Sequence, residues 1–326
     1  MTMTPRERVR AALEHRPVDR TPRFEIWIDG LLDELGFADA QQAAVALDQD
    51  CVMMPSRSLP GSLAWQTGVD EWGCVWQDGV YVSGVVDTDA DLERYRVSPT
   101  QADLLFDAAH VKAVQAQYPD HCHIYGTHIG PFMAGYMALG FTRFFMRLYD
   151  DRVFIERLLA DRTAWAIAVF QRAVDLGAAV IVLGDDAGHA NGPMIAPDLW
   201  RELILPCHKQ IVDALPVPVL WHSDGDVLPL LPLAIEAGFV GFHGLEPNFG
   251  IDLAAVKREF GRDLVLVGNV DMGLLCGDDR GAVRADVDRC LAQGGTEGYM
   301  IATCNSIFAG LDVAAVCEMF RYLDSE

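Results

Sequence analysis

Short apolar runs alternate with longer amphipathic stretches along the whole chain. The runs are too short for helices, so we predict strands at residues 23–28, 51–54, 123–126, 179–184, 217–221, 239–242, 264–267 and 298–302. Apolar residues recur at helical spacing in other stretches, which predicts helices at 151–176, 198–214, 228–237 and 280–293. Alternating strands and helices indicate parallel strands joined by crossover helices. Eight such units in 326 residues predict one α/β domain, residues 1–326, folded as a (β/α)8 TIM barrel; an open doubly wound sheet is the alternative.

Two segments depart from this alternation. Residues 5–15 predict a helix packed outside the barrel, because Thr4 suits the N-cap and Pro5 the first helical position. The segment between the second and third strands is longer than one helix needs. Within it, Asp78-Gly79 separates two β-rich runs, which is a hairpin signal. We therefore predict a small β excursion at about residues 70–85 that covers part of the barrel.

Composition and charge narrow the class of protein. The net charge is −22, which argues against nucleic acids and anionic membranes as partners, because both require basic patches. No apolar run approaches the ~20 residues of a membrane-spanning helix, and the first residues lack the apolar core of a signal peptide. Eight scattered cysteines favour reduced thiols over a disulfide framework. These features predict a cytoplasmic protein.

Polar side chains follow most of the predicted strands. In TIM barrels the carboxyl ends of the strands form the active site, so these residues are the candidates for chemistry. They are Glu25, Asp29, His128, Asp185, Asp186, His189, His222, Asp224, His243, Glu246, Asn269, Asp271, Cys304 and Asn305. The predicted site is rich in carboxylates and imidazoles and contains one thiol.

The strand at 217–221 ends in His222-Ser223-Asp224-Gly225, and the strand at 298–302 leads to Cys304. In an extended chain His222 and Asp224 point to the same side. We therefore predict a metal bound by His222, Cys304 and either Asp224 or Glu246. Nitrogen, sulfur and oxygen donors together favour zinc. The alternative is that His222 is a hydrogen-bonded structural histidine and Cys304 a small buried apolar residue.

Asp185 and Asp186 follow the apolar strand at 179–184. Adjacent carboxylates raise the pKa of one of them, which suits acid–base chemistry or binding of a cationic group. The alternative is that one carboxylate caps a helix or faces water. The glycines around these residues lack the Gly-x-Gly-x-x-Gly order, and the chain has no P-loop, so we predict no nucleotide cofactor.

Several motifs, in their order along the chain, resemble the uroporphyrinogen decarboxylase superfamily. They are Thr4-Pro5-Arg6-Glu7-Arg8-Val9, Arg16-Pro17-Val18-Asp19-Arg20-Thr21-Pro22, Asp70-Glu71-Trp72-Gly73, Gly130-Pro131-Phe132, Asp185-Asp186 with Gly192-Pro193, His222-Ser223-Asp224-Gly225, Leu245-Glu246-Pro247, Gly268-Asn269-Val270-Asp271, and Gly298-Tyr299 leading to Asn305-Ser306-Ile307. The resemblance implies a (β/α)8 barrel. True decarboxylases of this superfamily carry an arginine motif after the first strand, where this chain has Phe24-Glu25-Ile26-Trp27, and a histidine near Asn305. A porphyrinogen carries many carboxylates, so the missing arginines argue against it as the substrate.

The resemblance is stronger to the corrinoid-dependent methyltransferases of the same superfamily. Their zinc site, His-x-Cys plus a later Cys, corresponds here to His222, Asp224 and Cys304, with a carboxylate in place of one thiolate. The resemblance implies a zinc methyltransferase that moves a methyl group between a thiol, methoxyl or amine compound and a separate corrinoid (cobalamin) protein. The expected roles of the other site residues are as follows: Glu246 a fourth ligand or a partner that fixes the tautomer of His222, and Asp185, Asp186, His189 and Asn305 catalytic.

Two other functions stay open at this point. One is a carboxy-lyase acting on uroporphyrinogen or a smaller carboxylic acid, with Asp185 or Asp224 as the acid. The other is a non-catalytic barrel that binds a small ligand. Fold alone does not choose among the three. We expect a small-molecule substrate and no nucleic-acid or membrane partner, and the sequence leaves a homodimer open.

Overall fold

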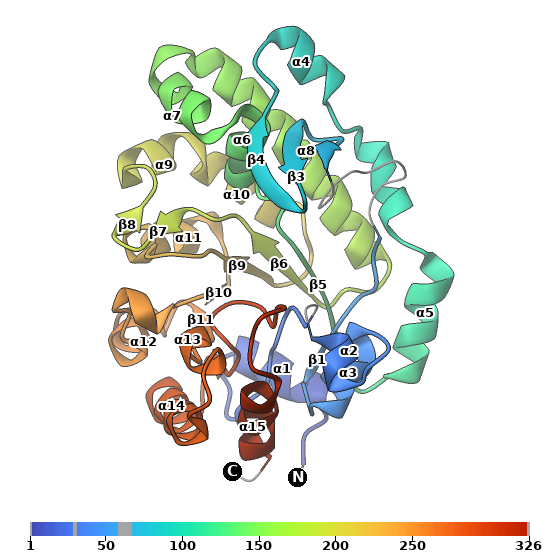
Figure 1. Cartoon of the computed structure of the whole chain (residues 1–326), viewed down its shortest axis with the longest axis vertical. Helices are drawn as coiled ribbons and strands as arrows, with labels where there is room; N and C mark the ends of the chain where they lie inside the picture. The colour runs from blue at the N-terminus through green and yellow to red at the C-terminus, as the bar shows by residue number, and fades with distance from the viewer. Residues whose placement is uncertain (1, 29–30, 58–66, 325–326) are drawn as a thin grey trace.

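A curled parallel sheet forms the centre of the molecule (Figure 1). The computed structural model describes residues 2–28, 31–57 and 67–324. Seven strands lie side by side in sequence order: β1 (Cys51–Met53), β5 (Cys122–Thr127), β6 (Val180–Gly184), β9 (Val219–His222), β10 (Gly241–His243), β11 (Val265–Val267) and β12 (Tyr299–Met300). Each neighbouring pair is parallel. The predicted α/β class with a parallel sheet is confirmed, and the curl is consistent with a TIM-barrel-like fold.

The segment 23–28, predicted as the first strand, forms no ladder strand. It makes isolated parallel bridges from Arg23 to Ile301 and from Ile28 to Ile307, next to β12. On its other side the amide of Asp50, just before β1, donates to the carbonyl of Arg23 at 2.9 Å. The segment thus contacts both end strands of the curled sheet without continuous pairing to either.

Helices follow or precede the strands and cover the outside of the sheet (Figure 1). The longer ones are α1 (Pro5–Leu13), α5 (Ala108–Gln117), α6 (Pro131–Leu139), α7 (Phe141–Asp150), α8 (Arg152–Asp175), α10 (Leu205–Asp213), α12 (Leu253–Phe260), α14 (Arg280–Gly294) and α15 (Val313–Leu323). The shorter ones are α2 (Leu32–Leu35), α3 (Ala40–Ala46), α4 (Asp89–Arg94), η1 (Pro99–Leu105), α9 (Pro197–Leu203), η2 (Leu228–Leu230), α11 (Leu231–Ala237), η3 (Pro247–Phe249) and α13 (Met272–Leu275). Thr4 caps α1 as predicted, in a reciprocal pair with Glu7.

Two predicted helices are broken where proline occurs. The stretch 198–214 divides into α9 and α10 at Ile204, with Pro206 in the first turn of α10. The stretch 228–237 divides into η2 and α11, with Pro229 and Pro232 near the starts. Proline lacks the N–H that an uninterrupted helix needs, and it is tolerated only in a first turn. The predicted helical conformation of both stretches is therefore confirmed, but the prediction of one continuous helix in each is wrong.

The hydrophobic core has two layers that the strands separate. The inner cluster includes Phe24, Ile26, Cys51, Ile124, Val180, Val182, Leu220, Val265, Val267, Met300 and Ala302. The larger outer cluster packs the other strand face against the helices and includes Trp221, Phe242 and Ile301. Because strand side chains alternate, the residue two positions after an inner residue also points inward. Leu220 is an inner residue, so His222 lies at the inner side of the upper rim.

The chain between β1 and β5 forms a separate antiparallel sheet of β2 (Gly68–Val69), β3 (Cys74–Gln77) and β4 (Val80–Gly84). Asp70 organises its first turn, accepting the N–H groups of Trp72 and Cys74 and the indole N–H of Trp76 at 2.7–2.9 Å. The fully buried Arg162 of α8 donates to the carbonyl of Trp72 at 3.0 Å. This sheet is therefore tied to the helical layer by a buried cation.

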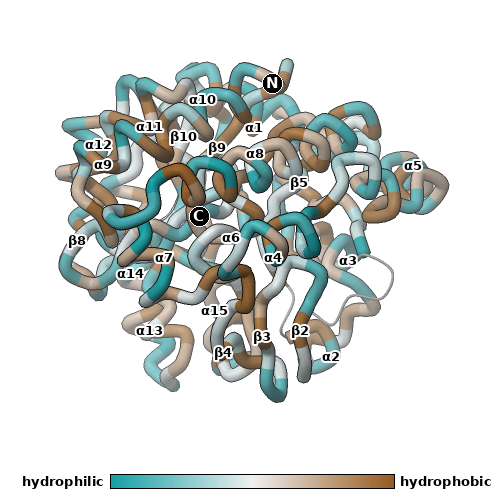
Figure 2. The backbone as a smooth tube through the Cα atoms, turned by 90° about the horizontal axis from the view of Figure 1, so that it is seen from above, coloured by the Kyte–Doolittle hydropathy of each residue, from teal (hydrophilic) through white to brown (hydrophobic). Residues whose placement is uncertain are grey.

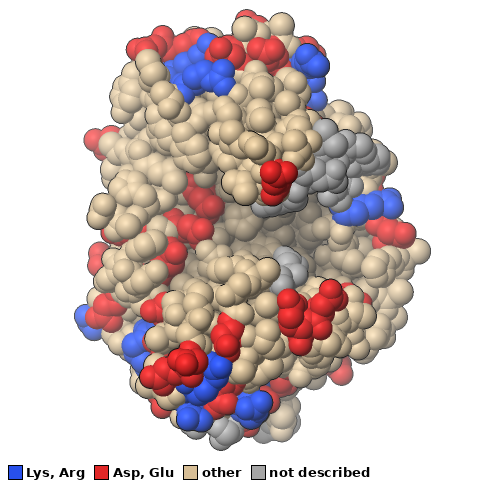
Figure 3. All heavy atoms as spheres, in the orientation of Figure 1, with Lys and Arg blue, Asp and Glu red and all other residues tan. Residues whose placement is uncertain are grey.

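The surface reflects the acidic composition. Hydrophilic and hydrophobic segments alternate along the outer helices in Figure 2, as expected for helices with one buried face. In Figure 3 the centre of the visible face is hollowed, and acidic side chains line one side of the hollow. No helix among the described residues combines the length and apolar character needed to cross a membrane.

Candidate functional site

Two histidines stand side by side at the ends of neighbouring strands. His222 ends β9 and His243 ends β10, and the two are register partners in the parallel sheet. Their Nδ1 atoms lie 2.7 Å apart, and both side chains are buried. The Nε2 of His243 lies 3.1 Å from the carbonyl oxygen of Thr303. Burial lowers the pKa of His243 to about 4 and also lowers the pKa of His222, so both rings are neutral near pH 7.

These contacts fix where the ring protons lie. A carbonyl oxygen only accepts, so the Nε2 of His243 carries its proton and the Nδ1 of His243 is the acceptor. The Nδ1 of His222 must then donate to it. A neutral imidazole has one N–H, so the Nε2 of His222 carries a free lone pair.

That lone pair faces carboxylates. Asp224 Oδ1 lies 3.5 Å and Asp186 Oδ1 3.9 Å from the Nε2 of His222. His128, Asp186 and His222 each offer one ligand atom within 4.8 Å of the others; among the described residues this is the group of three or more such side chains that is compact enough to hold a metal ion. A lone pair and two carboxylates repel one another unless a proton or a cation lies between them.

The strand ends place these side chains together. Gly184, the last residue of β6, is the register partner of His222, and Asp186 follows it by two residues. A Cβ on Gly184 would approach the His128 ring to 2.7 Å, so glycine provides the room that this ring occupies. Three neighbouring strands, β5, β6 and β9, thus deliver the three members of the group to one rim.

Polar contacts hold the carboxylates in place. Asn305 donates from Nδ2 to Asp224 Oδ1 at 2.7 Å, and the amide of Asp224 donates to Asp186 Oδ1 at 3.1 Å. Glu246 accepts the amide N–H of Gly225. Burial, then repulsion from Asp186 and Glu246, raise the pKa of Asp224 to about 7, while Asn305 opposes the rise. Burial also raises the pKa values of Asp186 and Glu246. Three carboxylates gathered in a partly buried site form an environment that a cation relieves.

Trp27 forms one wall of this site, and the sequence analysis did not select it. Its ring centroid lies 4.6 Å from that of His128 and 5.0 Å from that of His222. Trp27 lies near the end of the segment 23–28, at the rim where candidate residues were sought. Its aromatic ring gives no signal in the sequence, because an aromatic residue after an apolar run has the pattern of core packing.

The predicted catalytic residues fall into different places. Asp186, Asp224, Glu246 and Asn305 lie at the site as described above. Asp185 is fully buried and faces away from it, accepting the amide N–H of Met133 in α6 at 2.6 Å and contacting the Nε2 of His208 in α10 at 2.7 Å. This corresponds to the helix-capping alternative.

His189 lies on a short antiparallel hairpin formed by β7 (Gly188–His189) and β8 (Gly192–Pro193). It is exposed, and its Nδ1 accepts the amide N–H of Asn191 at 3.1 Å. Asn269 is fully buried and donates to the carbonyl of Leu245 at 2.8 Å. Asp29 lies outside the described residues.

Cys304 lies at the same rim, four residues after β12, and is buried. Burial, reinforced by nearby carboxylates, raises the pKa of its thiol. Its sulfur is not a member of the compact group that contains His222, within the described part of the chain. Glu246 was expected to be a fourth ligand or the tautomer partner of His222. Its carboxylate accepts the amide N–H of Gly225, and the Nδ1 of His222 contacts His243 instead.

The donors present suit a divalent metal ion. Imidazole nitrogens and carboxylate oxygens both bind zinc, and the unprotonated Nε2 of His222 has the form that a metal requires. Without a thiolate in the compact group, this donor set is harder than the predicted one and also accommodates other first-row divalent ions. The arrangement therefore fits a metal through its nitrogen and oxygen donors.

Comparison with known proteins gives consistent results. A family model described as uroporphyrinogen decarboxylase (URO-D) matches residues 45–325. The chain is 22% identical over 289 residues to the methylcobamide:CoM methyltransferase MtbA of Methanosarcina acetivorans, and 24% identical over 290 residues to MtbA of Methanosarcina mazei; each match covers 82% of this chain and 83% of the relative. A solved structure described as a methyltransferase from Methanosarcina mazei is similar over 99% of both chains, with a TM-score of 0.76 and 21% identity, and shows the shared fold.

Proposed function

Because the chain belongs to the uroporphyrinogen decarboxylase family, we propose that it is a metal-dependent methyltransferase that exchanges a methyl group with a corrinoid protein. The other partner in the exchange is a small thiol, methoxyl or amine compound. Curated relatives that match most of this chain are named methylcobamide:CoM methyltransferases, which supports this chemistry over decarboxylation. The proposal includes a (β/α)8 barrel in which the segment 23–28 occupies the place of the first strand, with β2–β4 as the insertion after β1.

The observation that carries the proposal is the free lone pair of His222 directed at two carboxylates. His222 is the first ligand we assign, and Asp186 and His128 complete the compact group. Asp224 is not a member of that group, but its Oδ1 lies 3.5 Å from the Nε2 of His222 and is a further donor within reach. A bound zinc ion supplies Lewis acidity, which lowers the pKa of a thiol or hydroxyl group. Asn305 keeps Asp224 oriented toward His222, and Trp27 excludes water from one side of the site.

The electrostatics of the site argue against a polyanionic substrate. Within residues 2–28, 31–57 and 67–324, no Arg or Lys forms an ion pair with Asp186, Asp224 or Glu246. A porphyrinogen would bring further carboxylates to these acids without a cation to receive them. A small neutral thiol, methoxyl compound or amine meets no such repulsion.

The direct test combines metal analysis with a methyl-transfer assay. Purified protein is expected to contain about one equivalent of zinc and to transfer the methyl group of methylcobalamin to coenzyme M. In that reaction the cobalt–carbon bond breaks, a carbon–sulfur bond forms, cobalt keeps the electron pair as cob(I)alamin, and the thiol proton passes to solvent. The spectrum of the corrinoid reports the product.

Two alanine variants test the metal site separately from methyl transfer. His222→Ala is expected to lose the metal, whereas His110→Ala, on the exposed face of α5, keeps it. Unchanged metal content in His222→Ala would remove the metal site. Turnover of uroporphyrinogen without metal would replace the proposal with decarboxylation.

Cobalt substitution decides whether the predicted Cys304 ligand joins the donor set. A thiolate bound to Co²⁺ gives an intense charge-transfer absorption in the near ultraviolet, which nitrogen and oxygen donors do not give. If Cys304 is a ligand, the band is present and disappears in Cys304→Ser. If the donors are those of the compact group, the band is absent and Cys304→Ser keeps the metal.

A further inference from the structure

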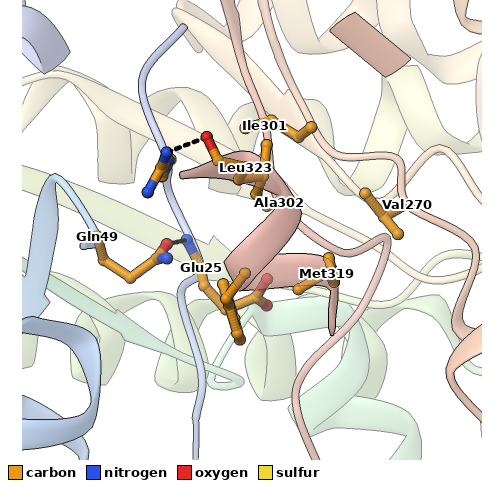
Figure 4. A pocket seen from close by; sticks show the side chains of 9 residues that line it. Glu25, Gln49, Val270, Ile301, Ala302, Met319 and Leu323 are labelled. Carbon is orange, nitrogen blue, oxygen red and sulfur yellow. Dashed lines mark hydrogen bonds between the residues drawn. The ribbon is translucent and has the colours of Figure 1, made fainter. Parts of the chain in front are cut away.

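A buried carboxylate, Glu25, is connected to the candidate site although it lies outside it. It follows Phe24 and precedes Ile26, both members of the inner cluster, so its side chain points to the outer side of the sheet. There it borders a small cavity of about 10 Å³, close to the size of one water molecule, together with Gln49 and Met319 of α15 (Figure 4). A buried carboxyl group in such a place needs hydrogen-bond partners.

Those partners lead to the metal site. Glu25 accepts the hydroxyl of Thr303 at 2.7 Å and its amide N–H at 2.9 Å. The carbonyl of Thr303 accepts the Nε2–H of His243, whose Nδ1 contacts that of His222. We propose that Glu25, Thr303 and His243 form a hydrogen-bond chain through the wall of the sheet that holds His222 in its metal-binding tautomer. This inference rests on the metal of the proposed function.

The links that involve backbone groups have a fixed direction. A backbone N–H only donates, so Glu25 is an acceptor toward Thr303. The carbonyl of Thr303 only accepts, so the Nε2–H of His243 donates to it. The Nδ1 of His243 then accepts a hydrogen bond from the Nδ1–H of His222. All four side chains are at most 3% exposed, so water does not compete for these contacts. The lone pair on the Nε2 of His222 therefore follows from the carbonyl of Thr303, and Glu25 on the far side of the strands holds the residue that carries this carbonyl.

This hydrogen-bond chain differs from a single partner group in how it sets the tautomer of the metal-binding histidine. Metal-binding histidines commonly donate their second N–H to a carboxylate or a carbonyl. Here the acceptor is another imidazole, which itself has two tautomers. The carbonyl of Thr303 selects the tautomer with hydrogen on Nε2. The amide of Cys304 donates to the carbonyl of Val270 at 3.0 Å, which also fixes the peptide that carries the Thr303 carbonyl. His243 is thus a positioning residue, with Thr303 and Glu25 behind it.

The first experiment reads the tautomer without any variant. Protein labelled with ¹⁵N at histidine is prepared without metal, and long-range proton–nitrogen correlation spectra identify which ring nitrogen of each histidine carries hydrogen. We expect Nδ1–H at His222 and Nε2–H at His243. Nε2–H at His222 in the metal-free protein would overturn the inference.

The second experiment measures zinc affinity by competition with a chelator. His243→Phe keeps the size of the ring and removes the acceptor, and it is expected to weaken zinc binding by about 10- to 100-fold. In His243→Asn the side-chain oxygen takes the place of Nδ1, so most of the affinity is expected to return. The matched control is His123→Phe, a buried histidine at the start of β5, which is expected to bind zinc like the wild type. Circular dichroism checks that each variant is folded.

The outcomes separate this inference from the proposed function. Equal zinc affinity in His243→Phe and the wild type would overturn the positioning role even if methyl transfer occurs. If the wild type binds no metal but His222 carries Nδ1–H, the metal of the proposed function fails and the hydrogen-bond chain stands. If His243→Phe does not fold, the tautomer measured in the wild type still decides the inference.

Discussion

Replacing Glu25 with glutamine is expected to change how stability depends on pH. Burial raises the pKa of Glu25 from 4.5 to about 7, although the two hydrogen bonds from Thr303 oppose the rise. Glutamine has nearly the same shape and carries no titrating proton. Each pKa unit corresponds to about 1.4 kcal/mol, so a rise of this size makes the ionised form about 3 kcal/mol less favourable in the folded protein than in the unfolded chain.

The direction in which stability changes with pH follows from proton linkage. Below pH 4.5 Glu25 is protonated in both states, and its contribution to stability is fully present. As the pH rises toward 7 the unfolded chain loses this proton first, so the folded state is progressively destabilised until Glu25 ionises in both states. The unfolding free energy of the wild type, relative to Glu25→Gln, should therefore fall by about 3 kcal/mol between pH 4.5 and 7.5.

Urea unfolding followed by tryptophan fluorescence, at half-unit pH steps, measures this difference. Comparing wild type with variant cancels the other titrating groups. Glu259→Gln, at an exposed glutamate on α12, is the matched control for the chemical substitution itself. A constant difference for Glu25→Gln, or one that grows with pH, would refute the reasoning that burial dominates the environment of Glu25.

Three further substitutions test the supports of the site. Asp185→Asn leaves a buried histidine on α10 without its carboxylate and should lower the unfolding free energy by about 3 kcal/mol in urea melts, with zinc content unchanged. Arg162→Met leaves the buried carbonyl of Trp72 unpaired; we expect a loss of about 2 kcal/mol and faster proteolysis within β2–β4, detected by mass spectrometry. Gly184→Ala places a methyl group against the His128 ring and should weaken zinc binding about tenfold in the chelator assay, while an unchanged affinity would exclude His128 as a ligand.

The sequence predicted the sheet well because strand length and composition are local properties. Seven of the predicted apolar runs overlap strands of the parallel sheet. The exception, residues 23–28, alternates charged and apolar residues at its start and pairs only through isolated bridges. Continuous pairing depends on how two distant neighbours lie, in this case β1 and β12, and no local pattern contains that information. For the same reason helix existence was predicted at 198–214, but its interruption near Pro206 was missed.

The candidate site was predictable in part. Spacing correctly placed His222 near Asp224, because residues two apart in an extended chain share a side. The same rule, applied to Asp185 and Asp186, separates them: adjacent side chains point to opposite faces, so only Asp186 reaches the rim. The prediction that Asp185 and Asp186 act together did not take this alternation into account. Trp27 was missed because an aromatic residue after an apolar run has the pattern of core packing.

The arrangement of protons at the site lay beyond sequence reasoning, and it determines what the site can bind. His222 in its other tautomer would direct an N–H at Asp224 and Asp186 and would have no lone pair there for a metal. The difference between these two sites is a single proton, placed by the carbonyl of Thr303 through His243. Residues 25, 222, 243 and 303 come together only when the sheet curls and its two ends approach one another. A residue pattern names the candidate ligand, but the contacts that the curled sheet brings together decide which of its ring nitrogens is unprotonated.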